Sequence, residues 1–105
     1  MENIIDLLEE MDEEIEGAKK YAKMAVKCAE MKHSSCASTY SSMAEQELDH
    51  YEKLHNMVVD HIHNMKEDES GETKAVKAMY EYHHKGQVKE IAHVRYILAQ
   101  AKKSF

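Results

Sequence analysis

Apolar residues recur every three to four positions along most of this 105-residue chain, the spacing of one face of an α-helix. Two polar interruptions break the pattern. The first, 32–35, offers serines as caps for a following helix, and the second, 67–71, ends in the turn residue Gly71. The pattern therefore predicts three long helices of about 30 residues each, joined by short loops. The apolar face of the first helix is expected to consist of Ile4, Leu7, Leu8, Met11, Ile15, Ala18, Tyr21, Ala22, Ala25, Cys28 and Ala29.

Short loops place consecutive helices side by side in opposite directions. We therefore expect an all-α fold, an antiparallel bundle of three long helices that forms one domain over residues 1–105. The composition agrees, because the chain has no proline, three glycines and no tryptophan, and its many Ala, Met, Glu and Lys residues favour helix. A chain of this length can bury one modest core.

The net charge of the chain indicates which classes of partner it can bind. The net charge is -6 and the lysines are scattered, which argues against a nucleic-acid backbone as a partner, whereas an acidic surface attracts cations. No apolar run reaches the roughly 20 residues that span a bilayer, and the amino terminus opens with acids rather than a basic and apolar signal. We expect a cytoplasmic protein without a membrane contact.

The two cysteines do not form a C-x-x-C pair, and they are too few for a disulfide framework. Cys28 and Cys36 would face each other near the end of the first helical hairpin. Buried free thiols are nevertheless the expected state, because a cytoplasmic compartment keeps thiols reduced.

Charged residues at positions of the apolar face carry the strongest functional signal. Glu14 shares its helical row with Leu7, Tyr21 and Cys28, whereas the other nearby acids fall on the expected solvent face; Glu10, at the edge of the apolar arc, is a weaker candidate. Glu-x-x-His occurs at five places. The helical spacing predicts that both side chains face the core in only two of these pairs, Glu47/His50 and Glu81/His84. The other three pairs are Glu30/His33, Glu52/His55 and Glu90/His93.

A carboxylate moved into an apolar interior costs several kcal/mol or more unless it is paired or coordinates a cation. Carboxylates at one level of a bundle also repel one another, and no Lys or Arg is expected on the core face nearby. Oxygen ligands with two imidazoles suit iron or manganese better than structural zinc. Because carboxylates can bridge two ions, a dinuclear site is expected. The alternative is a polar network in which the buried Glu and His residues satisfy each other.

These residues resemble the ferritin-like di-iron carboxylate family, and most closely rubrerythrin. Residues 14–21 and 44–50 resemble the first two helices of that family, including the spacing of 33 residues between Glu14 and Glu47. The Glu-x-x-His motif of the third helix resembles the final motif of the family. The resemblance implies two iron ions, with manganese as an alternative. It also implies that Tyr21 lies beside Glu14 and helps to position it, without binding the metal itself. The implied metal ligands are Glu14, Glu47, His50, Glu81 and His84.

The chain departs from that family in two respects. The family has four helices, so a second copy would complete the bundle as a homodimer or higher homo-oligomer, and Glu10 or water would replace the missing carboxylate. No C-x-x-C pairs are present, so the rubredoxin-type electron-transfer domain is lacking. The expected function is therefore ferroxidase-like reaction with oxygen or peroxide, or protection against oxidative stress. The alternative is a non-enzymatic helical interaction module that holds a structural metal or none.

Overall fold

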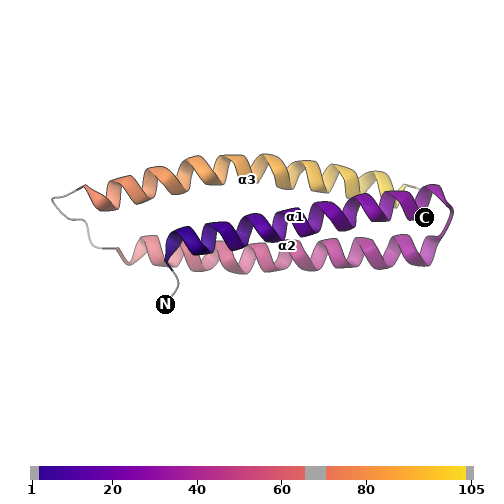
Figure 1. Cartoon of the computed structure of the whole chain (residues 1–105), viewed down its shortest axis with the longest axis horizontal. Helices are drawn as coiled ribbons and strands as arrows, with labels where there is room; N and C mark the ends of the chain where they lie inside the picture. Colours follow the sequence, from indigo (N-terminus) through magenta and orange to yellow (C-terminus); the bar gives the residue numbers. More distant parts are fainter. Residues whose placement is uncertain (1–2, 66–70, 104–105) are drawn as a thin grey trace.

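The computed structural model describes residues 3–65 and 71–103. It contains three α-helices: α1 (Ile4–Glu30), α2 (Ser34–His63) and α3 (Glu72–Lys102). They pack side by side into a narrow bundle of 60 × 23 × 15 Å (Figure 1). The prediction of an all-α chain with three long helices is confirmed, while residues 67–70 of the predicted second turn, 67–71, lie outside the described residues.

Local hydrogen bonds set the ends of α1. The Asn3 side chain accepts a hydrogen bond from the Asp6 backbone N–H at 2.9 Å and caps the first turn. At the other end Lys32 adopts a left-handed backbone with φ of 62°, and the His33 N–H donates to the Cys28 carbonyl at 2.9 Å. This turn satisfies carbonyls that the last helical turn leaves open.

The predicted serine caps of α2 are wrong. His33 is the N-cap residue, and its side chain makes no capping hydrogen bond. Because the left-handed residue Lys32 completes the turn immediately before His33, Ser34 and Ser35 already lie within the first turn of the helix.

α1 lies between the other two helices in Figure 1. The chain enters α2 at the end of the bundle where α1 finishes, and it enters α3 at the opposite end. Ion pairs of 3.4 Å join Lys19 to Glu90 and Lys102 to Glu45 at the surface. The main core is formed by Ile4, Leu7, Leu8, Met11, Ile15, Ala18, Ala22, Ala44, Leu48, Tyr51, Val58, Val94 and Leu98.

The predicted apolar face of α1 is confirmed except at Tyr21, which is only half-buried, and α2 is rotated from its expected phase. Glu47 and Leu54 are half-buried, and His50 and Met57 are exposed. The inward line of α2 consists of small and apolar residues with one large ring, which pack closely against the alanines of α1: Ala37, Ser41, Ala44, Leu48, Tyr51 and Val58.

α3 is rotated further, and the expected inward position of Glu81 is wrong. Glu81 is exposed, and Val88 is 50% exposed. The buried position is Gln87, whose amide donates to Asp12 Oδ1 at 3.1 Å and accepts from the Tyr51 hydroxyl at 3.4 Å. Because α3 carries apolar residues around much of its circumference, packing and this polar link select its inward face. That face consists of Thr73, Gln87, Val94, Leu98 and Ala101.

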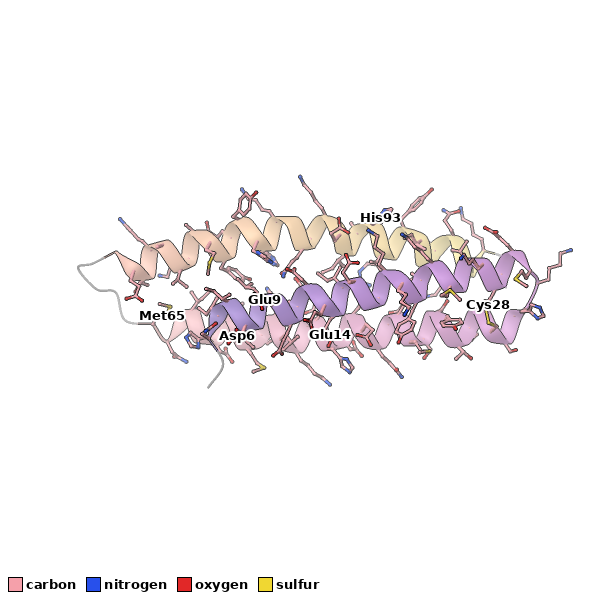
Figure 2. All side chains as sticks on the ribbon, in the orientation of Figure 1. Asp6, Glu9, Glu14, Cys28, Met65 and His93 are labelled. Atoms are coloured by element: carbon pink, nitrogen blue, oxygen red, sulfur yellow. A yellow bond between two sulfur atoms is a disulfide. The ribbon has the colours of Figure 1, made fainter. Side chains whose placement is uncertain are left out.

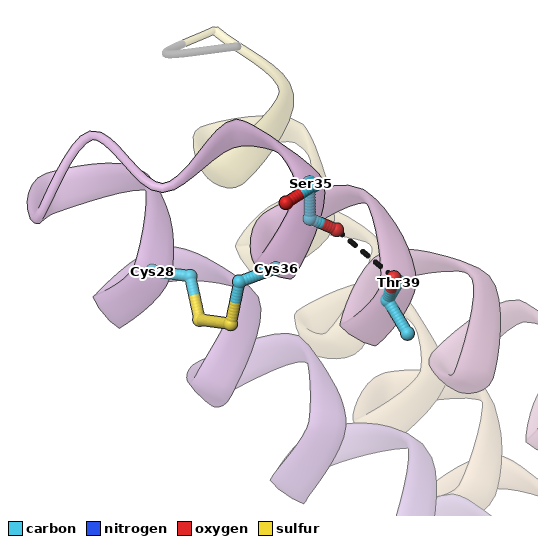
Figure 3. Close-up of a disulfide and its surroundings, with 4 residues drawn as sticks. All are labelled: Cys28, Ser35, Cys36 and Thr39. Carbon is cyan, nitrogen blue, oxygen red and sulfur yellow. Dashed lines mark hydrogen bonds between the residues drawn. A yellow bond between two sulfur atoms is a disulfide. The ribbon is translucent and has the colours of Figure 1, made fainter.

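Cys28 and Cys36 form a disulfide across the turn between α1 and α2 (Figure 3), so the expectation of free thiols is wrong. The turn brings their Cα atoms to 5.8 Å, within bridging distance. Nearby, the Thr39 hydroxyl donates to the Ser35 carbonyl at 2.9 Å. Cys28 also belongs to a small separate core with Ala29 and Ala37, which closes this end of the hairpin.

Hydropathy along the helices agrees with the absence of a long apolar run in the sequence. Over residues 3–65 and 71–103, no helix combines the length and the apolar character needed to cross a membrane.

Candidate metal centre

Three of the five predicted ligands converge between α1 and α2. Glu14 comes from α1 and points toward α2 (Figure 2), where Glu47 and His50 lie one turn apart. One ligand atom from each residue lies within 4.8 Å of the other two, and His50 Nδ1 is 3.3 Å from Glu14 Oε2. A single cation could therefore contact all three side chains.

The group lies at the edge of the bundle rather than at its centre. The Glu14 side chain is 26% exposed and the His50 side chain is 53% exposed. The rotation of α2 explains this position, because it turns His50 outward while Glu47 stays half-buried against α1. An ion can thus reach the three side chains from solvent without a rearrangement of the core.

The neighbouring Glu14 raises the pKa of the Glu47 carboxyl group. A hydrogen bond with Glu14 raises the pKa of Glu47 from 4.5 to about 6, and burial and repulsion by the Glu14 charge act in the same direction. The charge of His50 lowers it and only partly compensates. Two carboxyls and an imidazole held this close favour a bound cation, because a cation removes the repulsion that the proton otherwise relieves.

Gly17 makes room for the Glu47 carboxylate, a role that was not predicted from the sequence. A Cβ atom at Gly17 would lie 3.2 Å from Glu47 Oε2, closer than most Cβ contacts. The sequence held a signal for it, since a glycine in the middle of a helix costs about 1 kcal/mol relative to alanine and therefore indicates a close approach.

Gly17→Ala is expected to weaken divalent-metal binding by about tenfold, because its methyl group displaces the Glu47 carboxylate. Isothermal titration with manganese measures the affinity without oxidation. Gly86→Ala is the matched control, since a Cβ there meets no atom within 4 Å, and it should leave the affinity unchanged. Equal affinities in the two variants would show that Gly17 does not position Glu47.

Glu81 and His84 lie apart from this group. Glu81 is exposed on α3. His84 stacks on His55 and Tyr80, with ring centroids 4.9 Å and 5.4 Å away, and His55 Nε2 lies 2.7 Å from the Tyr80 hydroxyl. Burial and the charge of His55 lower the pKa of His84. The two Glu-x-x-His pairs therefore occupy different environments in the chain.

The two other residues singled out around Glu14 also lie outside the group of three. Tyr21 stacks on Tyr40 of α2, with ring centroids 6.1 Å apart, and among the described residues no hydrogen bond joins it to Glu14. Glu10 is half-buried one turn before Glu14.

Comparison of the chain with protein-family models, curated proteins and solved structures finds no match.

Proposed function

We propose that this protein binds iron or manganese at Glu14, Glu47 and His50 and that, with iron, it reacts with oxygen or peroxide in a ferroxidase-like manner. The observation that carries the proposal is the convergence of two carboxyl groups and an imidazole, because the ligand atoms of Glu14, Glu47 and His50 lie within 4.8 Å of one another. Two carboxylates with one imidazole suit iron and manganese, whereas structural zinc sites favour thiolates and histidines.

The residues of the chain would have separate tasks. Glu47 would bind the cation in its deprotonated form, Glu14 would hold the cation from α1, and His50 would complete the group at the solvent side. Gly17 would keep α1 close enough for Glu47 to reach across. Bound ferrous iron would supply the electrons for the reduction of oxygen or peroxide.

The finer proposal is an antiparallel, ferritin-like bundle with a dinuclear centre. It is supported by the Glu and Glu-x-x-His motifs at matching levels of α1 and α2 and by the reversal of the chain between helices (Figure 1). Three protein ligands leave a second ion short of donors. A second copy of the chain, placed against the exposed side of His50, would provide them, which agrees with the expected homo-oligomer.

A non-enzymatic interaction module is the second candidate. It is favoured by the separation of Glu81 and His84 from the group of three, and by large side chains left at the surface of α3, where Tyr82 is 83% exposed and Tyr96 is 63% exposed. In this case the metal would stabilise the hairpin of α1 and α2 or would not bind at all.

Metal analysis after anaerobic loading with ferrous iron, followed by the optical spectrum on exposure to air, separates the two candidates. Stoichiometric iron with a ferric absorption band supports the first. Stoichiometric metal without oxidation supports a structural metal. No metal above background, with unchanged unfolding in chelator, would contradict the proposed site.

Metal affinity is expected to fall as the pH drops through about 6, because a proton on Glu47, whose pKa is about 6, competes with the cation. In the metal-free protein, the stability of the fold changes with pH in the opposite direction. The stabilisation from protonated Glu47 is full below 4.5 and is lost as pH rises through 6. Manganese titrations of the wild type and thermal unfolding of the metal-free protein between about pH 3.5 and about pH 7 (about one unit beyond each end of the range from 4.5 to 6) test the two expectations, and Glu47→Gln should abolish the pH dependence of the unfolding. Dependences that persist in Glu47→Gln would assign them to other groups.

A further inference from the structure

The outer face of α1 carries six exposed charges that are sorted by sign. They recur at alternating spacings of four and three residues, which keeps them in one row along the helix. The first half of the row is acidic and the second half is basic. This α1 charge row consists of Glu9, Glu13, Glu16, Lys20, Lys23 and Lys27, and Figure 2 labels Glu9 near its acidic end.

None of the six side chains has an ion pair or hydrogen bond with another residue that the structure describes. Lys19, beside the row, differs because it pairs with Glu90. The helix dipole favours acids near the start of a helix and bases near its end, but only over the terminal turns, whereas Glu16 and Lys20 lie near the middle of α1. On α3 the exposed acidic and basic residues are interspersed, with Glu81 and Glu90 lying among lysines.

We propose that the α1 charge row binds the same row of a second copy, with the two α1 helices in opposite directions across a two-fold axis level with Ala18. The row is self-complementary under this operation, as an isologous contact requires. Each glutamate then faces a lysine, and the residue numbers in every pair sum to 36. The pairs are Glu16 with Lys20, Glu13 with Lys23 and Glu9 with Lys27, each formed twice.

Two further features of this face fit the same partner. Ile5 and Met31, which are 54% and 67% exposed, would face each other at both ends of the contact, although Asp6 and Glu30 would meet there as like charges. A hollow of about 380 Å³ runs along the basic half of the row and could receive the carboxylates of the second copy. A nucleic acid or an anionic lipid surface would fit the basic half but would be repelled by the acidic half.

The contact does not depend on the proposed metal centre, because Glu14 points toward α2 and away from the row. Association through ion pairs at an exposed surface is salt-dependent. Sedimentation equilibrium of the full chain should therefore show a dimer at about 20 mM salt, with a dissociation constant at least about tenfold higher at about 500 mM.

Charge reversal tests the pairing directly. One variant changes the three glutamates of the row to lysine, and the other changes its three lysines to glutamate. In the metal-free state each alone should be monomeric at low salt, and an equimolar mixture should form a heterodimer. Circular dichroism checks that both variants fold. Glu47→Ala should dimerise as the wild type does. A monomeric wild type at low salt, self-association of the reversed variants, or loss of the dimer in Glu47→Ala would overturn the proposal.

Discussion

Glu47→Ala is expected to weaken ferrous-iron and manganese binding by more than about 100-fold. Loss of a residue that only positions a metal ligand already lowers affinity roughly 10- to 100-fold, and Glu47 is proposed to bind the metal directly. Glu47 is half-buried, as Glu14 is, and a hydrogen bond with Glu14 raises the pKa of Glu47 to about 6. The metal-free variant should fold at least as well as the wild type at pH 7.5 (about 1.5 units above the raised pKa), since the substitution removes a repulsive charge. Equilibrium titration with manganese and thermal unfolding measure the two quantities.

Glu81→Ala is the matched control, because Glu81 starts the same Glu-x-x-His motif but is exposed on α3. It should retain the affinity of the wild type. His50→Ala should lose binding as Glu47→Ala does, since Nδ1 of His50 lies 3.3 Å from Glu14. If Glu81→Ala lost metal to the same extent as Glu47→Ala, α3 would have to contribute ligands, and the site of three residues would be wrong.

Met11→Ala is expected to lower the free energy of unfolding by about 2–5 kcal/mol, because it leaves a cavity where the core cannot fully collapse. Met11 is fully buried, with no exposed surface, on the inward face of α1, the helix that packs against both α2 and α3. Urea unfolding followed by circular dichroism measures the change.

Met31→Ala provides the comparison for that substitution. Met31 is 67% exposed at the end of α1, so its truncation should change stability by less than about 0.5 kcal/mol. Equal losses in the two variants would contradict the described packing of α1. A loss confined to Met11→Ala would confirm which face of α1 is buried.

The candidate site was only partly predictable from the sequence. Glu14 could be located because α1 has one clear apolar stripe and this acid interrupts it. The same reasoning selected Glu47 and His50 but placed both in the core, whereas His50 is exposed. Gly17 was missed as a contributor, because only the distance between the helices shows that a Cβ atom there would meet the Glu47 carboxylate.

The cysteine pair shows the same limit. Their separation of eight residues allowed either free thiols or a bridge. The compartment expected from composition favoured thiols, but the conformation of the turn at Lys32 decided the pairing, since it sets the distance between the two Cα atoms.

Sequence alone determined that the chain is all-α, where its helices lie and which face of α1 is inward, because the 3.6-residue period and the polar interruptions are local properties. Tertiary structure decided the rotation of α2 and α3. Apolar residues surround much of α3, so several faces could pack against α1, and the burial of Gln87 with Asp12 and Tyr51 selected one. That rotation placed Glu47 and His50 beside Glu14 and left Glu81 at the surface, since a helix turned about its axis carries all its side chains with it.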